Sequence, residues 1–165
     1  MLEAARTEDD GIPVHLADAA ALPFPDGFAD LAIAFMSLQD IDDAEAAIGE
    51  AARVLKPGGR FCLAVVHPFG SAGRFAGYEA DAPFVVDGSY LERFRYRDEL
   101  ERDGLRVVFE SEHRPIEWYV DALVGAGFVV ERLREVGMPE EAVENDRHRR
   151  WQRLPLFLHL RTLRP

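Results

Sequence analysis

The chain has 165 residues, of which 48% are hydrophobic and 30% are charged, and its formal net charge at pH 7 is −11. This is the composition of an ordinary globular protein with enough chain for one core. Its acidity argues against nucleic acid as the main partner and against an anionic membrane surface, because both require a basic face. The apolar runs are too short to span a bilayer and the start has no apolar signal segment, so we expect a cytoplasmic protein.

The first residues predict the end of a helix and then two strands joined by a loop. Met1–Arg6 predicts the end of a helix, and Ile12–Ala17 predicts a short strand that ends at Asp18. A loop rich in Pro, Gly and Asp follows, as expected between regular elements. Leu31–Met36 is almost wholly apolar, which predicts a strand in the interior of a parallel sheet, covered on both faces.

A helix and a second strand come next. Asp42-Asp43 offers an N-cap to a helix over Ala44–Leu55, whose apolar residues recur at helical spacing. The segment Lys56-Pro57-Gly58-Gly59 stops the helix and turns the chain. Phe61–Val66 predicts a strand in which Cys62 is a small buried side chain. Strand, helix and strand in close order predict a parallel βαβ unit with a right-handed crossover.

The second half of the chain begins with an irregular excursion and returns to regular elements. The excursion covers about 68–88. We then expect a hairpin over Tyr90–Glu110 that turns at Asp103-Gly104, and a helix over Pro115–Gly125. The remaining elements are a strand over Phe128–Val136, a polar segment over Glu140–Arg150 and a last strand over Leu154–Leu163.

Three segments together carry a resemblance to a known family. They are HLADAAALPFPDGFADLAIAFMSLQDIDD, AIGEAARVLKPGGRFCLAVVHP and HRPIEWYVDALVGAGFVVERLRE. In order and spacing they resemble the class I S-adenosylmethionine-dependent methyltransferases of the type 11 domain family, over nearly the whole chain. One small departure is Phe28-Ala29-Asp30, where the family usually has Phe directly before Asp. The resemblance implies an α/β, Rossmann-like sheet with an antiparallel C-terminal strand, and transfer of a methyl group from S-adenosylmethionine to a small molecule.

The family's glycine-rich cofactor loop has no counterpart here. No G-x-G follows a strand upstream of Asp18, and Gly125-Ala126-Gly127 follows a helix and fits a helix stop. We therefore expect residues 1–165 to form a single partial methyltransferase domain, N-terminally truncated with the first two strands missing, and with a substrate-cover insertion at about 68–114. Leu31–Met36 would then be an exposed sheet edge, through which a second copy could pair to form a homo-oligomer. The alternative function is a non-catalytic remnant of the fold that acts as an oligomeric or interaction module.

The resemblance also implies the cofactor-binding residues. The carboxylate of Asp18 would accept a hydrogen bond from the adenine amino group, and the backbone amide of Ala19 would meet the ring. Phe35, Met36 and Ser37 would lie along the adenosine and the methyl-transfer point, where an aromatic face attracts the cationic sulfonium. The alternatives are a simple turn at Asp18 and plain core packing for Phe35 and Met36.

Substrate and catalytic candidates follow the same strand ends. Gln39 is placed for polar contacts to cofactor or substrate, and Phe75, Tyr78 and Tyr90 either line an apolar substrate pocket or tether the excursion to the sheet. His67, at the end of its strand, is either a general base toward a substrate hydroxyl or amine, or a structural histidine in the turn before Pro68. No residue spacing suggests a metal site.

Overall fold

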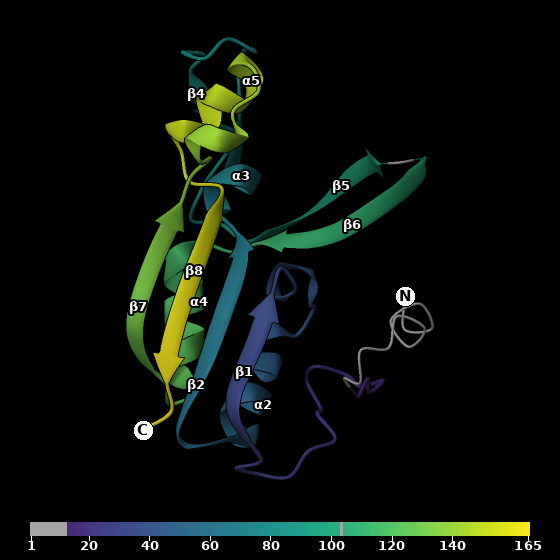
Figure 1. Ribbon diagram of the computed structural model, residues 1–165, viewed down its shortest axis with the longest axis vertical. Coiled ribbons are helices and arrows are strands. Elements are labelled where there is room, and N and C mark those ends of the chain that lie inside the picture. The colour runs from purple at the N-terminus through teal and green to yellow at the C-terminus, as the bar shows by residue number, and fades with distance from the viewer. Residues whose placement is uncertain (1–12, 103) are drawn as a thin grey trace.

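The computed structural model describes residues 13–102 and 104–165 (Figure 1). A four-stranded sheet with the order β1-β2-β8-β7 organises it. Its strands are β1 (Ala29–Phe35), β2 (Leu55–Val66), β7 (Val129–Val136) and β8 (Phe157–Leu163). β8 runs antiparallel to both of its neighbours, as expected for the last strand. The predicted helix end at Met1–Arg6 lies outside the described residues.

The predicted βαβ unit is confirmed. β1 pairs parallel to β2, and α2 (Ala44–Val54) connects them. The side chain of Asp43 caps α2 by accepting a hydrogen bond from the backbone N–H of Ala46 at 3.0 Å. The predicted turn segment Lys56–Gly59 lies within the first residues of β2, where Gly58 has φ 82°, a conformation that favours glycine.

The connections beyond β2 build two projections at the carboxyl end of β1 and β2. The hairpin β5 (Phe94–Arg102) and β6 (Leu105–His113) extends away from the sheet, and its predicted turn residue Asp103 lies outside the described part (Figure 1). An upper lobe continues the long axis of the molecule above the sheet. It contains α3 (Pro68–Ala72), β3 (Gly73–Phe75), β4 (Phe84–Val86), η2 (Glu140–Ala142), α5 (Asp146–Arg149) and η3 (Arg150–Gln152).

The hydrophobic core lies between the sheet and two helices, α2 and α4 (Ile116–Gly125), which both lie behind the sheet in Figure 1. Ile48 and Leu123 of the helices are fully buried against sheet residues such as Leu158. Burying one such side chain contributes roughly 1.5–3 kcal/mol to folding. Alternate residues of β2 and β8 point into this core, which fixes the register of both strands.

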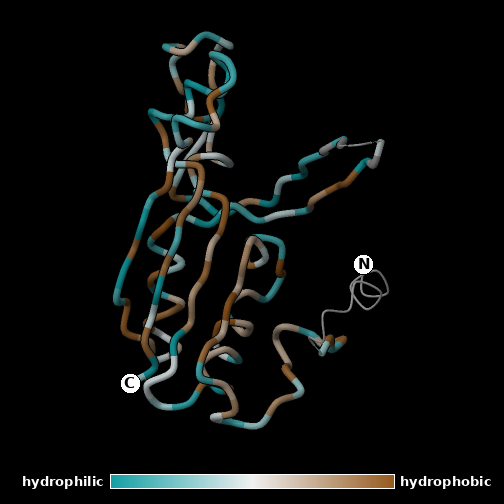
Figure 2. The backbone as a smooth tube through the Cα atoms, in the orientation of Figure 1, coloured by the Kyte–Doolittle hydropathy of each residue, from teal (hydrophilic) through white to brown (hydrophobic). Residues whose placement is uncertain are grey.

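The opposite face of the sheet is open, so the prediction that β1 is covered on both faces is wrong for the described residues. Ala32 and Ala34 pack against the core, whereas Leu31, Ile33 and Phe35 are 52%, 67% and 73% exposed. The larger apolar side chains of β1 thus lie on the uncovered side. Figure 2 shows hydrophobic colouring along this strand. For the same reason the Cys62 side chain is half-buried rather than buried.

The strand predicted over Ile12–Ala17 is not formed in its described part, residues 13–17. A strand needs a hydrogen-bonded neighbour, and β1 pairs only with β2 in the described chain. The loop that follows is held by α2 instead. Arg53 donates to the carbonyls of Leu22 and Phe24 at 3.0 and 2.8 Å, and Glu50 accepts from the N–H of Leu22 at 2.7 Å. The bidentate bond from Arg53 lowers the pKa of Glu50 to about 2.

Candidate functional site

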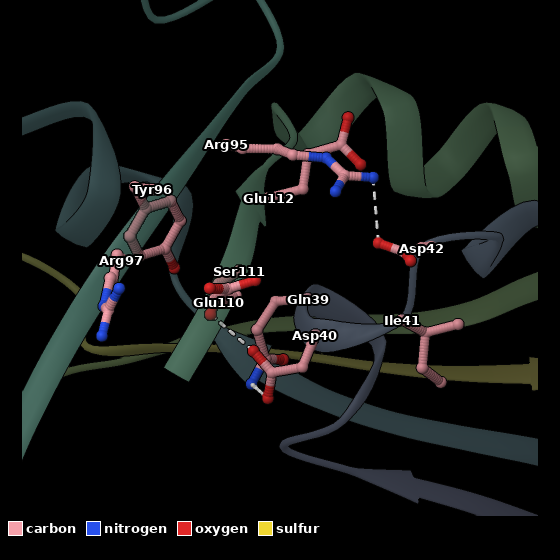
Figure 3. Close-up of a pocket in the computed structure, with 10 residues that line it drawn as sticks. All are labelled: Gln39, Asp40, Ile41, Asp42, Arg95, Tyr96, Arg97, Glu110, Ser111 and Glu112. Atoms are coloured by element: carbon pink, nitrogen blue, oxygen red, sulfur yellow. Dashed lines mark hydrogen bonds and ion pairs between the residues drawn. The ribbon is translucent and has the colours of Figure 1, made fainter. Parts of the chain in front are cut away.

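The chain turns sharply where β1 ends. Met36 has φ 51°, and it is the only non-glycine residue at positive φ in the described residues. Such a conformation is uncommon outside glycine and often marks a functional turn. It directs the chain into η1 (Leu38–Asp40), which faces the base of the β5–β6 hairpin across a cavity of about 310 Å³ (Figure 3). The cavity is lined by Gln39, Asp40, Ile41, Asp42, Arg95, Tyr96, Arg97, Glu110, Ser111 and Glu112.

Gln39 and Ser111 are the buried polar residues of this cavity, each 7% exposed. The Nε2 of Gln39 donates to Asp40 at 3.2 Å. Its Oε1 is buried and has no hydrogen-bond partner among the described residues. A buried acceptor without a donor costs free energy, so this oxygen is available to a donor on a ligand. Asp40 also accepts from the hydroxyl of Ser111 at 2.5 Å.

Charge in the cavity is mostly neutralised at its rim. Arg95 pairs with Asp42 at 2.9 Å, and Glu112 pairs with Arg93 at 2.7 Å. The Asp40 carboxylate differs, because the hydrogen bonds to it come from the neutral donors Gln39 and Ser111. The cavity therefore presents hydrogen-bond acceptors at the end of β1.

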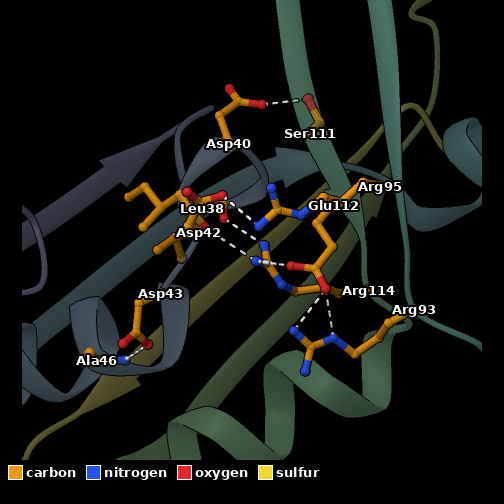
Figure 4. Close-up of polar contacts among 11 residues, drawn as sticks. Leu38, Asp40, Asp42, Asp43, Ala46, Arg93, Arg95, Ser111, Glu112 and Arg114 are labelled. Carbon is orange, nitrogen blue, oxygen red and sulfur yellow. Dashed lines mark hydrogen bonds and ion pairs between the residues drawn. The ribbon is translucent and has the colours of Figure 1, made fainter.

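A buried arginine fixes the position of η1. Arg114 is 1% exposed and donates to the carbonyls of Leu38 and Ile41 at 2.8 and 2.9 Å (Figure 4). It also contacts Glu112 at 2.5 Å, and its guanidinium carbon lies 4.7 Å from the ring centroid of Trp118. Sequence reasoning missed Arg114, because the two carbonyls to which it donates lie more than seventy residues earlier. The only local signal is a cation directly before the proline that opens α4.

His67 is fully buried, and both of its ring nitrogens are engaged. Nδ1 accepts from the N–H of Phe69 at 3.1 Å, and Nε2 lies 2.9 Å from Glu135 Oε1. Because Nδ1 is an acceptor, Nε2 carries the proton and donates to Glu135. Burial lowers the pKa of His67 from its ordinary value of 6.5. This geometry matches the structural alternative for His67 and leaves neither nitrogen for a substrate, so its catalytic role stays a prediction without geometric support.

The aromatic candidates for a substrate pocket do not meet in one place. Tyr90 packs edge-on against His113, whose Nε2 donates to the Tyr90 carbonyl at 2.8 Å. Phe75 and Tyr78 line a different cavity in the upper lobe. Of the four predicted substrate residues, only Gln39 lines the cavity at the end of β1.

The predicted cofactor residues are also separated. Asp18 Oδ1 accepts from the N–H of Ala20 at 2.9 Å, so the turn that was the alternative role for Asp18 is present. Ala19 packs partly against the core, and Phe35 lies on the open face of the sheet. Asp18 lines neither the cavity at η1 nor the apolar hollow beside Phe35. The described residues therefore fit at most the part of S-adenosylmethionine that would lie at the end of β1, and they do not enclose the whole molecule.

Comparison with known sequences relates the first part of the chain to methyltransferases. Residues 1–63 match the family model described as a methyltransferase domain. A ubiquinone/menaquinone biosynthesis C-methyltransferase of Caulobacter sp. (strain K31) is 48% identical over 52 residues, which are 31% of this chain and 21% of the relative. The 27-O-demethylrifamycin SV methyltransferase of Amycolatopsis mediterranei is 43% identical over 77 residues, which are 47% of this chain and 27% of the relative. The matches thus span about a fifth to a quarter of these relatives.

Comparison with solved structures extends the likeness to the whole chain. An S-adenosylmethionine-dependent methyltransferase from Mesorhizobium loti aligns with a TM-score of 0.77 and 24% identity, over 99% of this chain and 76% of that protein. A similar protein from Listeria monocytogenes aligns with a TM-score of 0.75 and 19% identity, over 100% of this chain and 75% of that protein. The predicted α/β, Rossmann-like methyltransferase fold and the predicted resemblance to this class are confirmed.

Proposed function

We propose that this chain, whose fold is that of the class I S-adenosylmethionine-dependent methyltransferases, acts in methyl transfer from S-adenosylmethionine to a small molecule. One observation carries the proposal: the stretch related to methyltransferases, residues 1–63, contains the strained turn at Met36 and the η1 side of the cavity. In open α/β sheets, ligands bind beyond the carboxyl ends of the strands, which is where this cavity lies. The cofactor would supply an electrophilic methyl group.

The residues of the cavity would bind and orient the acceptor. The Oε1 of Gln39, which has no partner in the described part of the chain, and the carboxylate of Asp40 favour a substrate that donates hydrogen bonds through a hydroxyl or amine group. Orientation of the two reactants can supply much of the rate enhancement of a transfer reaction. Phe35, Met36 and Ser37 remain candidates for the cofactor side, and the excursion over 68–114 remains a candidate substrate cover.

A calorimetric titration of the chain with S-adenosylhomocysteine, with light scattering to measure mass, tests this proposal. We expect saturable binding, weakened about tenfold by Asp18→Asn if the carboxylate holds the adenine amino group. The amide of this variant can still accept from the N–H of Ala20, so the turn is kept. Asp30→Asn is the matched control, because Asp30 is exposed and pairs only with Lys56 among the described residues. A folded chain that gives no binding heat would contradict the proposal for this chain.

We also propose that the open face of β1 and its edge, which has no strand partner among the described residues, associate with a second copy of the chain. A free strand edge next to exposed apolar side chains is a common site of association. Beside Ile33 and Phe35 lies an apolar hollow of about 280 Å³. It is completed by Cys62, Leu63, Ala64, Arg132, Arg134, His159, Leu160 and Arg161.

The location of the protein in the cell and its lack of nucleic-acid and metal partners stay predictions. Within residues 13–102 and 104–165, none of the helices has the length and apolar character that a membrane crossing requires. The cytoplasmic location, the lack of a nucleic-acid partner and the lack of a metal site are inferences from the sequence alone.

A further inference from the structure

The upper lobe contains a second cavity, of about 350 Å³, where β3 meets α5 and η3. It is lined by Gly70, Gly73, Arg74, Phe75, Ala76, Gly77, Tyr78, Arg147, Arg150 and Trp151. Three of these residues are arginines and none carries a carboxylate, although the chain as a whole has a net charge of −11. It shares no lining residue with the cavity at η1.

Arg150 is the unusual residue of this cavity. It is 9% exposed, its Nη1 donates to the carbonyl of Gly77, and its Nε is buried without a partner among the described residues. Its guanidinium carbon lies 4.6 Å from the ring centroid of Phe75 and 5.6 Å from that of Tyr78. Arginine is rarely buried unless it is paired with an anion, because desolvating the charge costs free energy. Among the described residues, no carboxylate forms an ion pair with it.

A second guanidinium in the cavity also has no carboxylate partner in the described part of the chain. Arg147 lies with its guanidinium carbon 5.4 Å from the ring centroid of Tyr78. Two nearby arginines do have carboxylate partners. Arg149 pairs with Glu140 at 3.8 Å, and Arg74, which lines the same cavity, pairs with Asp87 at 2.5 Å. Two positive charges that have no carboxylate partner in residues 13–102 and 104–165 therefore line one cavity, and its aromatic walls accept flat apolar groups.

We propose that this cavity binds a small aromatic anion, with its carboxylate or phosphate group on Arg147 and Arg150 and its ring against Tyr78 and Trp151. A planar guanidinium can donate two parallel hydrogen bonds to either anion, and the partly enclosed site strengthens them. The anion compensates the buried charge of Arg150. This site is separate from the methyl-transfer proposal, because no residue of the cavity at η1 contributes to it.

Fluorescence of Trp151 offers a direct test. The other tryptophan, Trp118, lies on α4, and Trp118→Phe leaves Trp151 as the only reporter. The probes are benzoate, phenyl phosphate, inorganic phosphate and benzylamine. We expect saturable quenching by benzoate or phenyl phosphate that weakens as salt is added, weaker binding of inorganic phosphate, and none of the cation benzylamine. Calorimetry on the unsubstituted chain gives the same comparison without the Trp118 change.

A matched pair of variants locates the site. Arg147→Gln removes an exposed charge from the cavity and should weaken binding about tenfold or more. Arg149→Gln removes the same charge from the same short helix but not from the cavity, and it should leave binding unchanged. The proposal is overturned if neither aromatic anion binds, if both variants weaken binding equally, or if inorganic phosphate binds as tightly as phenyl phosphate. Binding of S-adenosylhomocysteine does not depend on this outcome.

Discussion

The imidazole of His67 shows how a single side chain can be held in one protonation state. Its Nδ1 accepts from the backbone, its Nε2 donates to Glu135, and the ring has no exposed surface. Protonation of Nδ1 would break the bond to Phe69 and place a charge in a buried site, so burial lowers the pKa of His67. The ring thus ties β2 to β7 and caps α3.

The stability of the protein should consequently fall in mild acid. The unfolded state binds a proton at His67 near pH 6.5, and the folded state binds it only at lower pH, so stability is complete above 6.5 and is lost as pH falls below it. The loss is about 1.4 kcal/mol for each unit by which the pKa is lowered. Urea denaturation between pH 7.5 and about 5 measures this slope.

His67→Gln is the informative variant, because its amide can still accept from Phe69 and donate to Glu135 but does not titrate. We expect a flatter pH dependence for this variant. An unchanged slope would assign the acid sensitivity to other groups.

At the scale of elements, η1 depends on a contact that comes from across the chain. This 3-10 helix is short, and Arg114, which directly precedes the N-cap of α4, donates to the carbonyl of Leu38 and to that of the C-cap residue Ile41. Packing of the Arg114 guanidinium over Trp118 holds the clamp on α4. The positions of Gln39 and Asp40 in the cavity therefore depend on α4 as well as on β1.

Arg114→Met should loosen η1 and reduce stability. The variant leaves two carbonyl groups without their donor, at a cost of about 1–3 kcal/mol for each that stays buried. Chemical denaturation followed by circular dichroism gives the free energy of unfolding. Arg95→Met is the control, because Arg95 is 72% exposed in its pair with Asp42 and such surface pairs contribute about 0–1 kcal/mol. Equal effects of the two variants would contradict the clamp.

At the scale of the whole molecule, the described elements cover one face of the sheet only. α2 and α4 pack on that side, and within the described residues the other side presents Ile33 and Phe35 beside a strand edge without a partner. A surface of this kind attracts a partner through the hydrophobic effect and through unpaired backbone groups.

We expect the chain to associate in solution, and Ile33→Lys to shift it toward the monomer by placing a charge on the open face. Light scattering coupled to size exclusion, over a series of concentrations, measures the mass. Val124→Lys is the matched control, because Val124 is 58% exposed but lies on α4. A monomeric unsubstituted chain, or equal masses for the two variants, would argue against association through β1.

The sequence by itself determined the order of the elements, because the signals for them are local. The cap at Asp43, the positive φ at Gly58, the hairpin β5–β6 and the helix α4 follow from residues within a few positions of each other. Only the tertiary structure decided which face of β1 is covered and that residues 13–17 form no strand, since both depend on neighbours that the local pattern does not specify. It likewise decided that Arg114 binds the carbonyls at η1 and that both ring nitrogens of His67 have hydrogen-bond partners. It also placed Phe75 and Tyr78 in a different cavity from Gln39. The physical reason is that a side chain's burial and partners depend on segments outside its own local stretch, for His67 on Glu135 and for Arg114 on η1, whereas its helix or strand preference does not.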